Sequence, residues 1–333
     1  MSERVTIVGD GAMATVCSIL LTAGGHQVTL WSAFEESIER LMQNRENQRF
    51  LPGVKLPRGV RLTADDADCF ADCTLILSAV PTQYMRSVWK RLAPHAPVGI
   101  PIVSVAKGIE NNTLLRPTQI IQDVVGKRAL AALSGPNIAA ELARYLPATA
   151  VAASQDADLV QRVQSAFSTQ WFRVYTNTDV IGVELAGAIK NIIAIAAGIL
   201  DGLAAGNNAK AALVTRGLVE ITRLGVAMGA LESTFHGLAG LGDLVTTCVS
   251  PEGRNRTVGE QIGKGRKLQD ILDGMDSVAE GVPTTKSVRE LSRRYQVEMP
   301  ITEAVHAVLF EGKDAIHALT DVMNRQPKSE VPA

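Results

Sequence analysis

A single lysine interrupts a long apolar segment in the middle of the chain. Lys190 lies within Ala186–Ala194, where every other residue except Asn191 is small or aliphatic. Burying an unpaired ammonium group costs free energy, so this position requires a partner or a chemical role. Two interpretations follow: Lys190 is an acid–base group in a buried site, or it lies at a helix edge and extends its amine to solvent.

Two further charged residues lie in settings suited to a buried site. Asp243 is in the apolar, glycine-rich run Ala239–Cys248, where a carboxylate needs a cation or hydrogen-bond donors. Lys190 is the obvious cation, and capping of a helix is the alternative role for Asp243. Lys107 follows the apolar run Ile102–Val105. If that run is a strand, Lys107 lies at the carboxyl end of a sheet, where open α/β folds bind ligands; a solvated loop lysine is the alternative.

An anion site is indicated by Gly253-Arg254-Asn255, which precedes a segment with helical character. A guanidinium fork together with the free amides of a helix N-terminus can hold a small dianion such as phosphate. The alternative is a solvated arginine.

Near the N-terminus, Gly9-Asp-Gly11-Ala-Met-Ala14 fits the pattern G-x-G-x-x-G/A. It follows a β-branched run, Val5–Val8, and opens a helical stretch, Met13–Ala23, which leads to a second strand-like run, Gln27–Trp31. In this context the first glycine permits a tight turn and the second lets the backbone approach a pyrophosphate. The segment therefore predicts a dinucleotide site.

The choice between NAD and NADP stays open. Ser32 and Ala33 follow the second strand, and they supply neither the carboxylate that holds a ribose hydroxyl nor an arginine for a 2′-phosphate. We expect both cofactors to work with weak discrimination, unless a residue such as Arg40 or Arg45 reaches the ribose.

Short apolar runs separated by polar or helical segments continue to about Asn177, which predicts a mainly parallel sheet covered on both faces. These further strands are expected at Cys73–Val80, Ile100–Val105, Ala129–Leu133, Ala148–Ala153 and Phe172–Tyr175. Beyond Asn177 the sequence is typical of helices. They are expected at Val180–Leu200, Asn208–Met228, Glu232–Leu238, Val258–Lys264, Leu268–Leu272, Thr284–Arg294 and Ile301–Phe310.

Bulk properties narrow the class of protein. The length of 333 residues suggests two domains, and a net charge of −1 provides no general attraction for nucleic acid or an anionic membrane. The most apolar stretch, Ile192–Leu203, is too short to span a bilayer and is interpreted as a buried helix. Without a recognisable secretory signal, the expected location is the cytoplasm. The four scattered cysteines are interpreted as buried structural thiols and the five histidines as structural or surface groups, and no metal site is expected.

The chain resembles the bacterial NAD(P)-dependent glycerol-3-phosphate dehydrogenases from the first strand to about residue 310. Six motifs carry the resemblance, in the family's order and spacing: Asn47–Gly53, Ser104–Glu110, Ser134–Glu141, Val183–Asn191, Gly240–Leu244 and Gly253–Arg256.

The resemblance implies an α/β protein with an N-terminal Rossmann-type, mostly parallel sheet (1–178) and an all-helical substrate domain (179–325). From the sequence itself, the tail 326–333 is expected to be disordered. The resemblance further implies interconversion of dihydroxyacetone phosphate and sn-glycerol 3-phosphate, for phospholipid synthesis, with NAD or NADP as cofactor and Lys190 as proton donor and acceptor. It is compatible with a homodimer. The substrate-binding residues implied are Lys107, Gly135, Asn137, Lys190, Asp243, Thr247, Gly253, Arg254 and Asn255. The cofactor-binding residues implied are Gly9, Gly11, Ala12, Met13, Ala33, Lys107, Ala139, Arg254, Val278 and Glu280.

The chain departs from the family pattern mainly around the cofactor. The family usually has an aromatic residue at Met13, glycine at Ala14, a basic residue near Ala33 and serine at Gly253. Two rivals remain: a two-domain dehydrogenase acting on a β-hydroxyacid or a ketopantoate-like substrate, and an NAD(P)-binding or redox-sensing protein without catalysis. The phosphate motif argues against the first rival, and the presence of Lys190, Asp243 and Arg254 together argues against the second.

Overall fold

One sheet organises the first half of the chain. The structure, a computed structural model, describes residues 2–327 and 329. Within them, eight strands form a sheet of order β3-β2-β1-β4-β5-β6-β7-β8, in which every neighbouring pair is parallel except β6 with β7. The strands are β1 (Arg4–Val8), β2 (Gln27–Trp31), β3 (Arg61–Thr63), β4 (Leu75–Ser78), β5 (Ile102–Ser104), β6 (Leu130–Ser134), β7 (Ala148–Ala153) and β8 (Phe172–Asn177).

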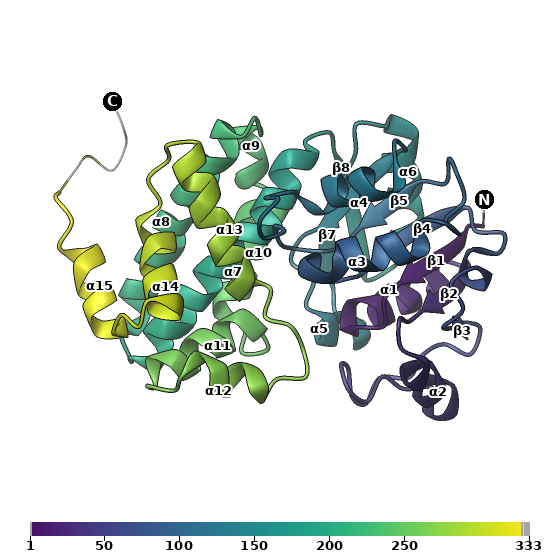
Figure 1. Cartoon of the computed structure of the whole chain (residues 1–333), viewed down its shortest axis with the longest axis horizontal. Coiled ribbons are helices and arrows are strands. Elements are labelled where there is room, and N and C mark those ends of the chain that lie inside the picture. The colour runs from purple at the N-terminus through teal and green to yellow at the C-terminus, as the bar shows by residue number, and fades with distance from the viewer. Residues whose placement is uncertain (1, 328, 330–333) are drawn as a thin grey trace.

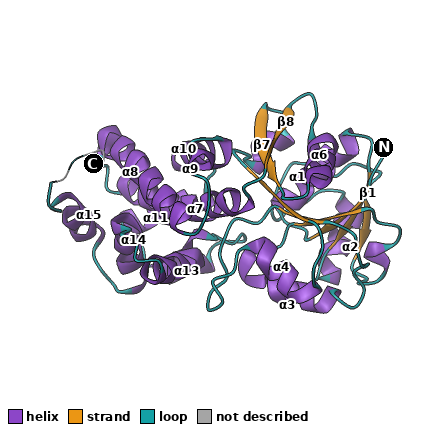
Figure 2. Ribbon diagram, turned by 90° about the horizontal axis from the view of Figure 1, so that it is seen from above, coloured by secondary structure: helices purple, strands orange, loops and turns teal. Residues whose placement is uncertain are grey.

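Helices cover both faces of this sheet, as Figure 2 shows with α1 and α6 on one side and α3 and α4 on the other. The two apolar layers are distinct: Leu20 and Val163 belong to one, and Met85 and Trp89 to the other. Strands buried on both faces need apolar residues throughout, and all four residues of β4 are buried. The helices of this half are α1 (Ala12–Ala23), α2 (Glu35–Asn44), α3 (Thr82–Leu92), α4 (Pro117–Val125), α5 (Ala139–Ala143) and α6 (Ala157–Phe167), with a 3-10 turn η1 (Asp68–Phe70).

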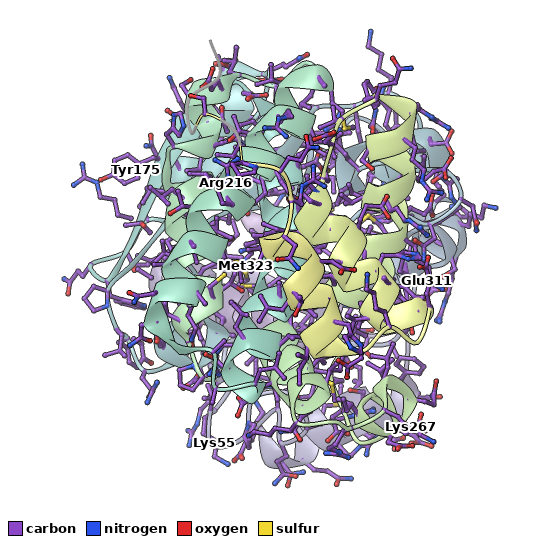
Figure 3. The ribbon with its side chains drawn as sticks, turned by 90° about the vertical axis from the view of Figure 1, so that its left-hand side faces the viewer. Lys55, Tyr175, Arg216, Lys267, Glu311 and Met323 are labelled. Atoms are coloured by element: carbon purple, nitrogen blue, oxygen red, sulfur yellow. The ribbon has the colours of Figure 1, made fainter. Side chains whose placement is uncertain are left out.

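The second half is helical and surrounds the central helix α7 (Figure 1). Its elements are α7 (Val180–Gly202), α8 (Gly206–Ala227), α9 (Glu232–Phe235), the π-helical turn η2 (Leu238–Gly242), α10 (Asp243–Val249), α11 (Arg254–Gly263), α12 (Leu268–Asp273), α13 (Gly281–Arg294), α14 (Pro300–Phe310) and α15 (Ala315–Met323). Among the described helices α7 alone is long and apolar enough to cross a bilayer, and 89% of its most apolar window is buried inside the protein. It is therefore a core helix, as predicted. Figure 3 shows the side chains from the helical end, where Met323 of α15 is labelled and is exposed.

Two glycines let α11 cross α7 at close range. A Cβ atom at Gly198 would lie 1.9 Å from the carbonyl oxygen of Arg256, and one at Gly259 would lie 1.9 Å from that of Ile195. No larger residue fits either position without moving a backbone. This contact fixes the start of α11, and hence Arg254, relative to α7 and Lys190.

The predicted architecture is confirmed: a mostly parallel sheet covered on both faces, followed by helices. Several details of the prediction were wrong. Strand β3 and helices α10 and α15 were not predicted, and α11 begins at Arg254 instead of at Val258. Arg254 has no apolar periodicity to mark it as helical, and β3 is only three residues long and pairs with β2 alone. The predicted disordered tail, 326–333, lies mostly outside the described residues.

Candidate active site

Asp243 joins the two lysines that the sequence singled out. Its Oδ1 lies 2.6 Å from the Nζ of Lys190, and its Oδ2 lies 2.8 Å from the Nζ of Lys107. Asp243 is 2% exposed and Lys190 is 6% exposed, so the Lys190 ammonium does not extend into bulk solvent. The alternatives of a solvent-directed Lys190 and of a capping role for Asp243 are wrong: Asp243 is the first residue of α10, and its carboxylate accepts from the lysines.

The Lys107 ammonium group donates to three acceptors. Besides Asp243, the carbonyl oxygen of Gly135 and the Oδ1 of Asn137 each accept a hydrogen bond from Nζ at 2.9 Å. Burial lowers the pKa of Lys107 to about 8, against the opposing attraction of Asp243. Behind it, the Nδ2 of Asn191 donates to the Lys107 carbonyl at 2.9 Å. Lys107 therefore connects the carboxyl ends of β5 and β6 to the middle of α7.

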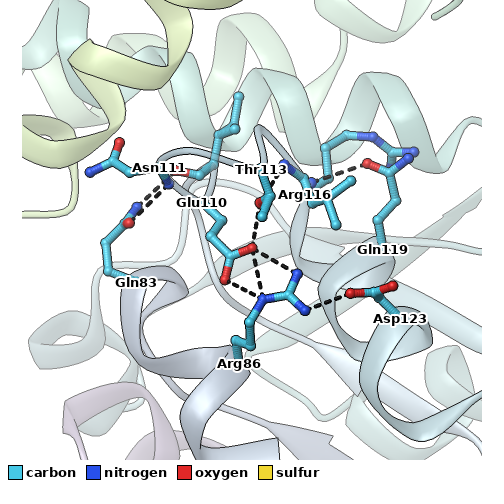
Figure 4. Close-up of polar contacts among 10 residues, drawn as sticks. Gln83, Arg86, Glu110, Asn111, Thr113, Arg116, Gln119 and Asp123 are labelled. Atoms are coloured by element: carbon cyan, nitrogen blue, oxygen red, sulfur yellow. Dashed lines mark hydrogen bonds and ion pairs between the residues drawn. The ribbon is translucent and has the colours of Figure 1, made fainter.

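The loop that carries Lys107 is fastened on its far side by a polar network (Figure 4). Arg86 of α3 donates from Nε and Nη2 to Glu110 at 2.9 to 3.1 Å and from Nη1 to Asp123 of α4. These hydrogen bonds raise the pKa of Arg86. From the helical half, the Oγ of Ser287 donates to the Oδ1 of Asn111 at 2.6 Å. The loop is thus held by both halves of the chain, which fixes the position of Lys107.

The predicted phosphate residues lie at the start of α11, against the segment that precedes α13. The Nη1 of Arg254 donates to the carbonyl oxygen of Val278 at 3.1 Å, and the Oδ1 of Asn255 accepts from the amide of Gly281 at 2.9 Å. Because Oδ1 is used in this way, the NH₂ group of Asn255 is left as the donor for a ligand. Gly253 is the residue that caps α11.

This group is adjacent to the lysine site. A Cβ atom at Gly281 would lie 2.7 Å from the carbonyl oxygen of Asn191 and 2.8 Å from the Oδ1 of Asn255, which places the start of α11 beside the residue that follows Lys190. Thr247 lies one helical turn after Asp243 in α10, so both are on the same helix face. Cation, carboxylate and anion-binding groups therefore meet within one region of the helical half.

Glu280 connects that region to the sheet. Its Oε1 accepts from the amide of Thr82 at 2.8 Å, at the first residue of α3, and its charge raises the pKa of Lys107 in opposition to burial. Glu280 thus lies between the two halves, at the carboxyl edge of the parallel strands.

The glycine turn at the start of α1 has the geometry of a dinucleotide cradle. Gly9 has φ +119°, and a Cβ atom there would lie 2.8 Å from the carbonyl oxygen of Ala79, so only glycine fits. Gly11 caps α1 and has no atom within 4 Å of an added Cβ, which leaves the helix N-terminus open to a pyrophosphate. Ala12 and Met13 form the first turn of α1. The residues present therefore fit the cofactor.

Two more of the predicted cofactor residues, Ala33 and Ala139, belong to the sheet half. Ala33 follows β2, and its carbonyl oxygen accepts from the Nη1 of Arg91 at 3.1 Å. Ala139 begins α5 and packs on the same apolar layer as α1.

Several residues that shape the site were not predicted from the sequence. Asn191 ends the motif Val183–Asn191, and Asn47 begins the motif Asn47–Gly53. The Nδ2 of Asn47 donates to the carbonyl oxygen of Asp10 at 2.7 Å, which fastens the glycine turn. Their motif positions were a usable signal. Arg91 and Thr82 had none, because their contacts depend on how α3 is oriented over the sheet.

Comparison with known proteins agrees with this geometry. Residues 4–160 match the family model described as the NAD-dependent glycerol-3-phosphate dehydrogenase N-terminus, and residues 179–320 match that of its C-terminus. The chain belongs to this family. It is 48% identical to the glycerol-3-phosphate dehydrogenase (NAD(P)+) of Citrifermentans bemidjiense, over 99% of each chain.

Solved structures separate the family from its rivals. A crystal structure of glycerol-3-phosphate dehydrogenase from Coxiella burnetii is 34% identical, with a TM-score of 0.94, over 97% of this chain and 99% of that one. A ketopantoate reductase from Ralstonia eutropha is 16% identical with a TM-score of 0.60, over 95% and 99% of the two chains, and shares the fold alone. The comparison of the two structures therefore agrees with membership of the glycerol-3-phosphate dehydrogenase family.

Proposed function

We propose that this chain interconverts dihydroxyacetone phosphate and sn-glycerol 3-phosphate, with NAD or NADP as the hydride carrier. The observation that carries the proposal is the buried Lys190–Asp243–Lys107 cluster, next to an arginine and an asparagine at a helix start. Such a combination provides a proton donor for a carbonyl oxygen and a binding site for a phosphate in one place.

Lys190 transfers the proton to and from the substrate oxygen. In the reducing direction its ammonium group gives a proton to the oxygen on C2 of the substrate, and in the oxidising direction its amine takes the proton from the C2 hydroxyl. Asp243 orients Lys190 through a 2.6 Å ion pair, and both side chains are buried, which strengthens the electrostatic interaction between them. When bound, the nicotinamide supplies or accepts the hydride.

The remaining residues bind and orient the substrate. Arg254 and Asn255 hold the phosphate, with the amides at the start of α11 and with Gly253 and Thr247 beside them. Lys107 and Asn137, already linked at 2.9 Å, face the carbonyl end with Gly135. Together they fix the reacting carbon relative to Lys190, which is how positioning contributes to rate.

The cofactor lies along the carboxyl edge of the parallel strands. Gly9, Gly11, Ala12 and Met13 bind the pyrophosphate, and Ala33 lies beside the adenosine ribose. Further residues complete the site nearer to the substrate: Lys107, Ala139, Arg254, Val278 and Glu280.

At the level of the whole protein, we propose a cofactor domain over 1–178 and a substrate domain over 179–325, working in the cytoplasm as a homodimer. The product would supply the glycerol phosphate backbone of phospholipids. An assay of dihydroxyacetone phosphate reduction with NADH and NADPH in parallel tests the reaction, and no consumption of either cofactor would contradict it.

Arg254→Lys tests the phosphate assignment. Lysine keeps the charge but loses the planar fork, so kcat/KM for dihydroxyacetone phosphate should fall at least about tenfold. Unphosphorylated dihydroxyacetone already lacks the phosphate, so the wild type should reduce it poorly and the variant should reduce it equally poorly. Equal losses for both substrates would show that Arg254 supports the cofactor or the fold instead.

A further inference from the structure

A guanidinium group lies at the end of β2, although neither Ser32 nor Ala33, the residues directly after the strand, is an arginine. Arg91, in the last turn of α3, donates from Nη1 to the carbonyl oxygen of Ala33 at 3.1 Å and from Nε to the Oδ2 of Asp66 at 2.7 Å. Its Cζ lies 5.2 Å from the ring centroid of Trp31, the last residue of β2. A distant helix therefore supplies a cation where the strand itself offers none.

Three contacts hold this cation in place, and it remains accessible. Asp66 also accepts from the Nε1 of Trp31 at 3.1 Å, so the carboxylate joins the ring and the guanidinium in one arrangement. The Arg91 side chain is 45% exposed, and its Nη2 has no hydrogen-bond partner among the described residues. A fixed guanidinium with free donors at one side is suited to a phosphate group.

Other charged groups near the end of β2 are occupied. The Oδ2 of Asp10 accepts from Ser32 at 2.8 Å and also from Ser37. Arg40 pairs with Glu36 along α2, and Arg45 donates to the carbonyl oxygens of Pro57 and Val60. Neither of the arginines considered from the sequence contacts Ala33, and Arg91 does.

We propose that Arg91 binds the 2′-phosphate of NADP and gives this chain a preference for the phosphorylated cofactor. In dinucleotide folds the adenosine ribose lies at the end of the second strand, and an arginine there accommodates a 2′-phosphate. Arg91 takes that place from α3, because Ser32 and Ala33, which directly follow β2, supply no cation. This inference rests on one part of the proposed function, the binding of a dinucleotide cofactor, and does not depend on the triose substrate.

The test measures binding without catalysis. Adenosine 2′,5′-bisphosphate and 5′-AMP are titrated calorimetrically into the full chain, as wild type and as Arg91→Ala. Loss of a charge-assisted contact should weaken binding of the bisphosphate at least about tenfold and leave 5′-AMP within about twofold. The affinity of Arg91→Lys for the bisphosphate should lie between those of the wild type and Arg91→Ala, since lysine keeps the charge but lacks the planar fork of donors. Arg40→Ala is the matched control and should bind both ligands as the wild type does.

The 5′-AMP titration also reports whether the variant is folded, because a collapsed site would lose both ligands. Equal affinity of the wild type for the two nucleotides, or equal losses in Arg91→Ala, would overturn the proposal. A chain that keeps the bisphosphate preference but fails to reduce dihydroxyacetone phosphate would contradict the proposed function and leave this inference standing.

Discussion

Asp243 balances two ammonium groups with one carboxylate, which leaves the buried cluster with a net positive charge. Because Lys107 and Lys190 each bind a different oxygen of Asp243, removal of one lysine leaves the carboxylate paired with the other. The contribution of each lysine to catalysis can therefore be measured without exposing an unpaired buried anion, which is the usual cause of misfolding in such sites.

Lys190→Ala should fold and lose turnover. The expected fall in kcat is at least about 10²-fold, the low end for loss of a positioned general acid. Lys210→Ala is a matched control: Lys210 pairs with Asp201, and Arg256 remains as a second partner of Asp201 at 2.6 Å. Its kcat should be close to that of the wild type. Near-normal turnover in folded Lys190→Ala would remove Lys190 from the mechanism.

Lys107 should make KM for the substrate depend on pH in the alkaline range. Burial lowers its pKa to about 8 from the ordinary 10.5, so its positive charge is present below pH 8 and is lost above it. Binding of the anionic substrate should weaken as pH rises through that value, and KM should rise. The free energy of unfolding should also increase between about pH 8 and 10.5, because over that range the unfolded chain binds more protons than the folded chain.

Lys107→Arg separates this group from other titrations. A guanidinium stays charged over the whole range, so the rise in KM near pH 8 should disappear from a pH profile recorded with the variant. An unchanged rise in KM with pH in Lys107→Arg would assign the titration to a different group.

At the scale of elements, regular patterns were predictable and irregular junctions were not. The glycine turn, the strands and α7 follow from apolar runs and glycine positions, which depend on nearby residues. Residues placed by tertiary contacts gave no such signal: β3 exists through pairing with β2, and α11 starts four residues before its apolar pattern. For the same reason Lys190 and Asp243 were correctly paired from their chemistry, whereas Glu280–Thr82 and Arg91–Ala33 required the structure.

Gly259→Ala tests how the α7–α11 crossing positions Arg254 and Asn255, the residues proposed to bind the phosphate. An added methyl group would lie 1.9 Å from the carbonyl oxygen of Ile195, so the helices must separate, at a cost of about 1–3 kcal/mol or more. We expect a lower free energy of unfolding in urea and a higher KM for dihydroxyacetone phosphate. Thr257→Ala, an exposed change on the same helix, should alter neither. An unchanged KM in Gly259→Ala would mean that Arg254 does not depend on this crossing.

At the scale of the whole molecule, the two halves are joined by apolar and ionic contacts outside the Lys190–Asp243–Lys107 cluster. Val183 of α7 packs with Ala132 and Val151 of the sheet. Glu184, the next residue, accepts from Arg116 and, at 2.8 and 2.7 Å, from the amide and hydroxyl of Thr118 in α4. We therefore expect the two halves to unfold in one cooperative transition. Helix α7 belongs to the core of the helical half and also packs against the sheet half.

Glu184→Gln should weaken this coupling strongly. Glu184 is 4% exposed, and removing its charge leaves Arg116, itself mostly buried, without an ionic partner, which costs about 3–5 kcal/mol in comparable buried pairs. Glu252→Gln is the matched control, because Glu252 pairs with Arg144 across the same two halves at 3.4 Å with both side chains exposed; its cost should stay below about 1 kcal/mol. Urea unfolding of both variants, followed by tryptophan fluorescence, measures the difference, and Trp31, Trp89 and Trp171 all report from the sheet half. Similar small losses in the two variants would show that Arg116 finds another partner and that the apolar contacts of Val183 carry the junction alone.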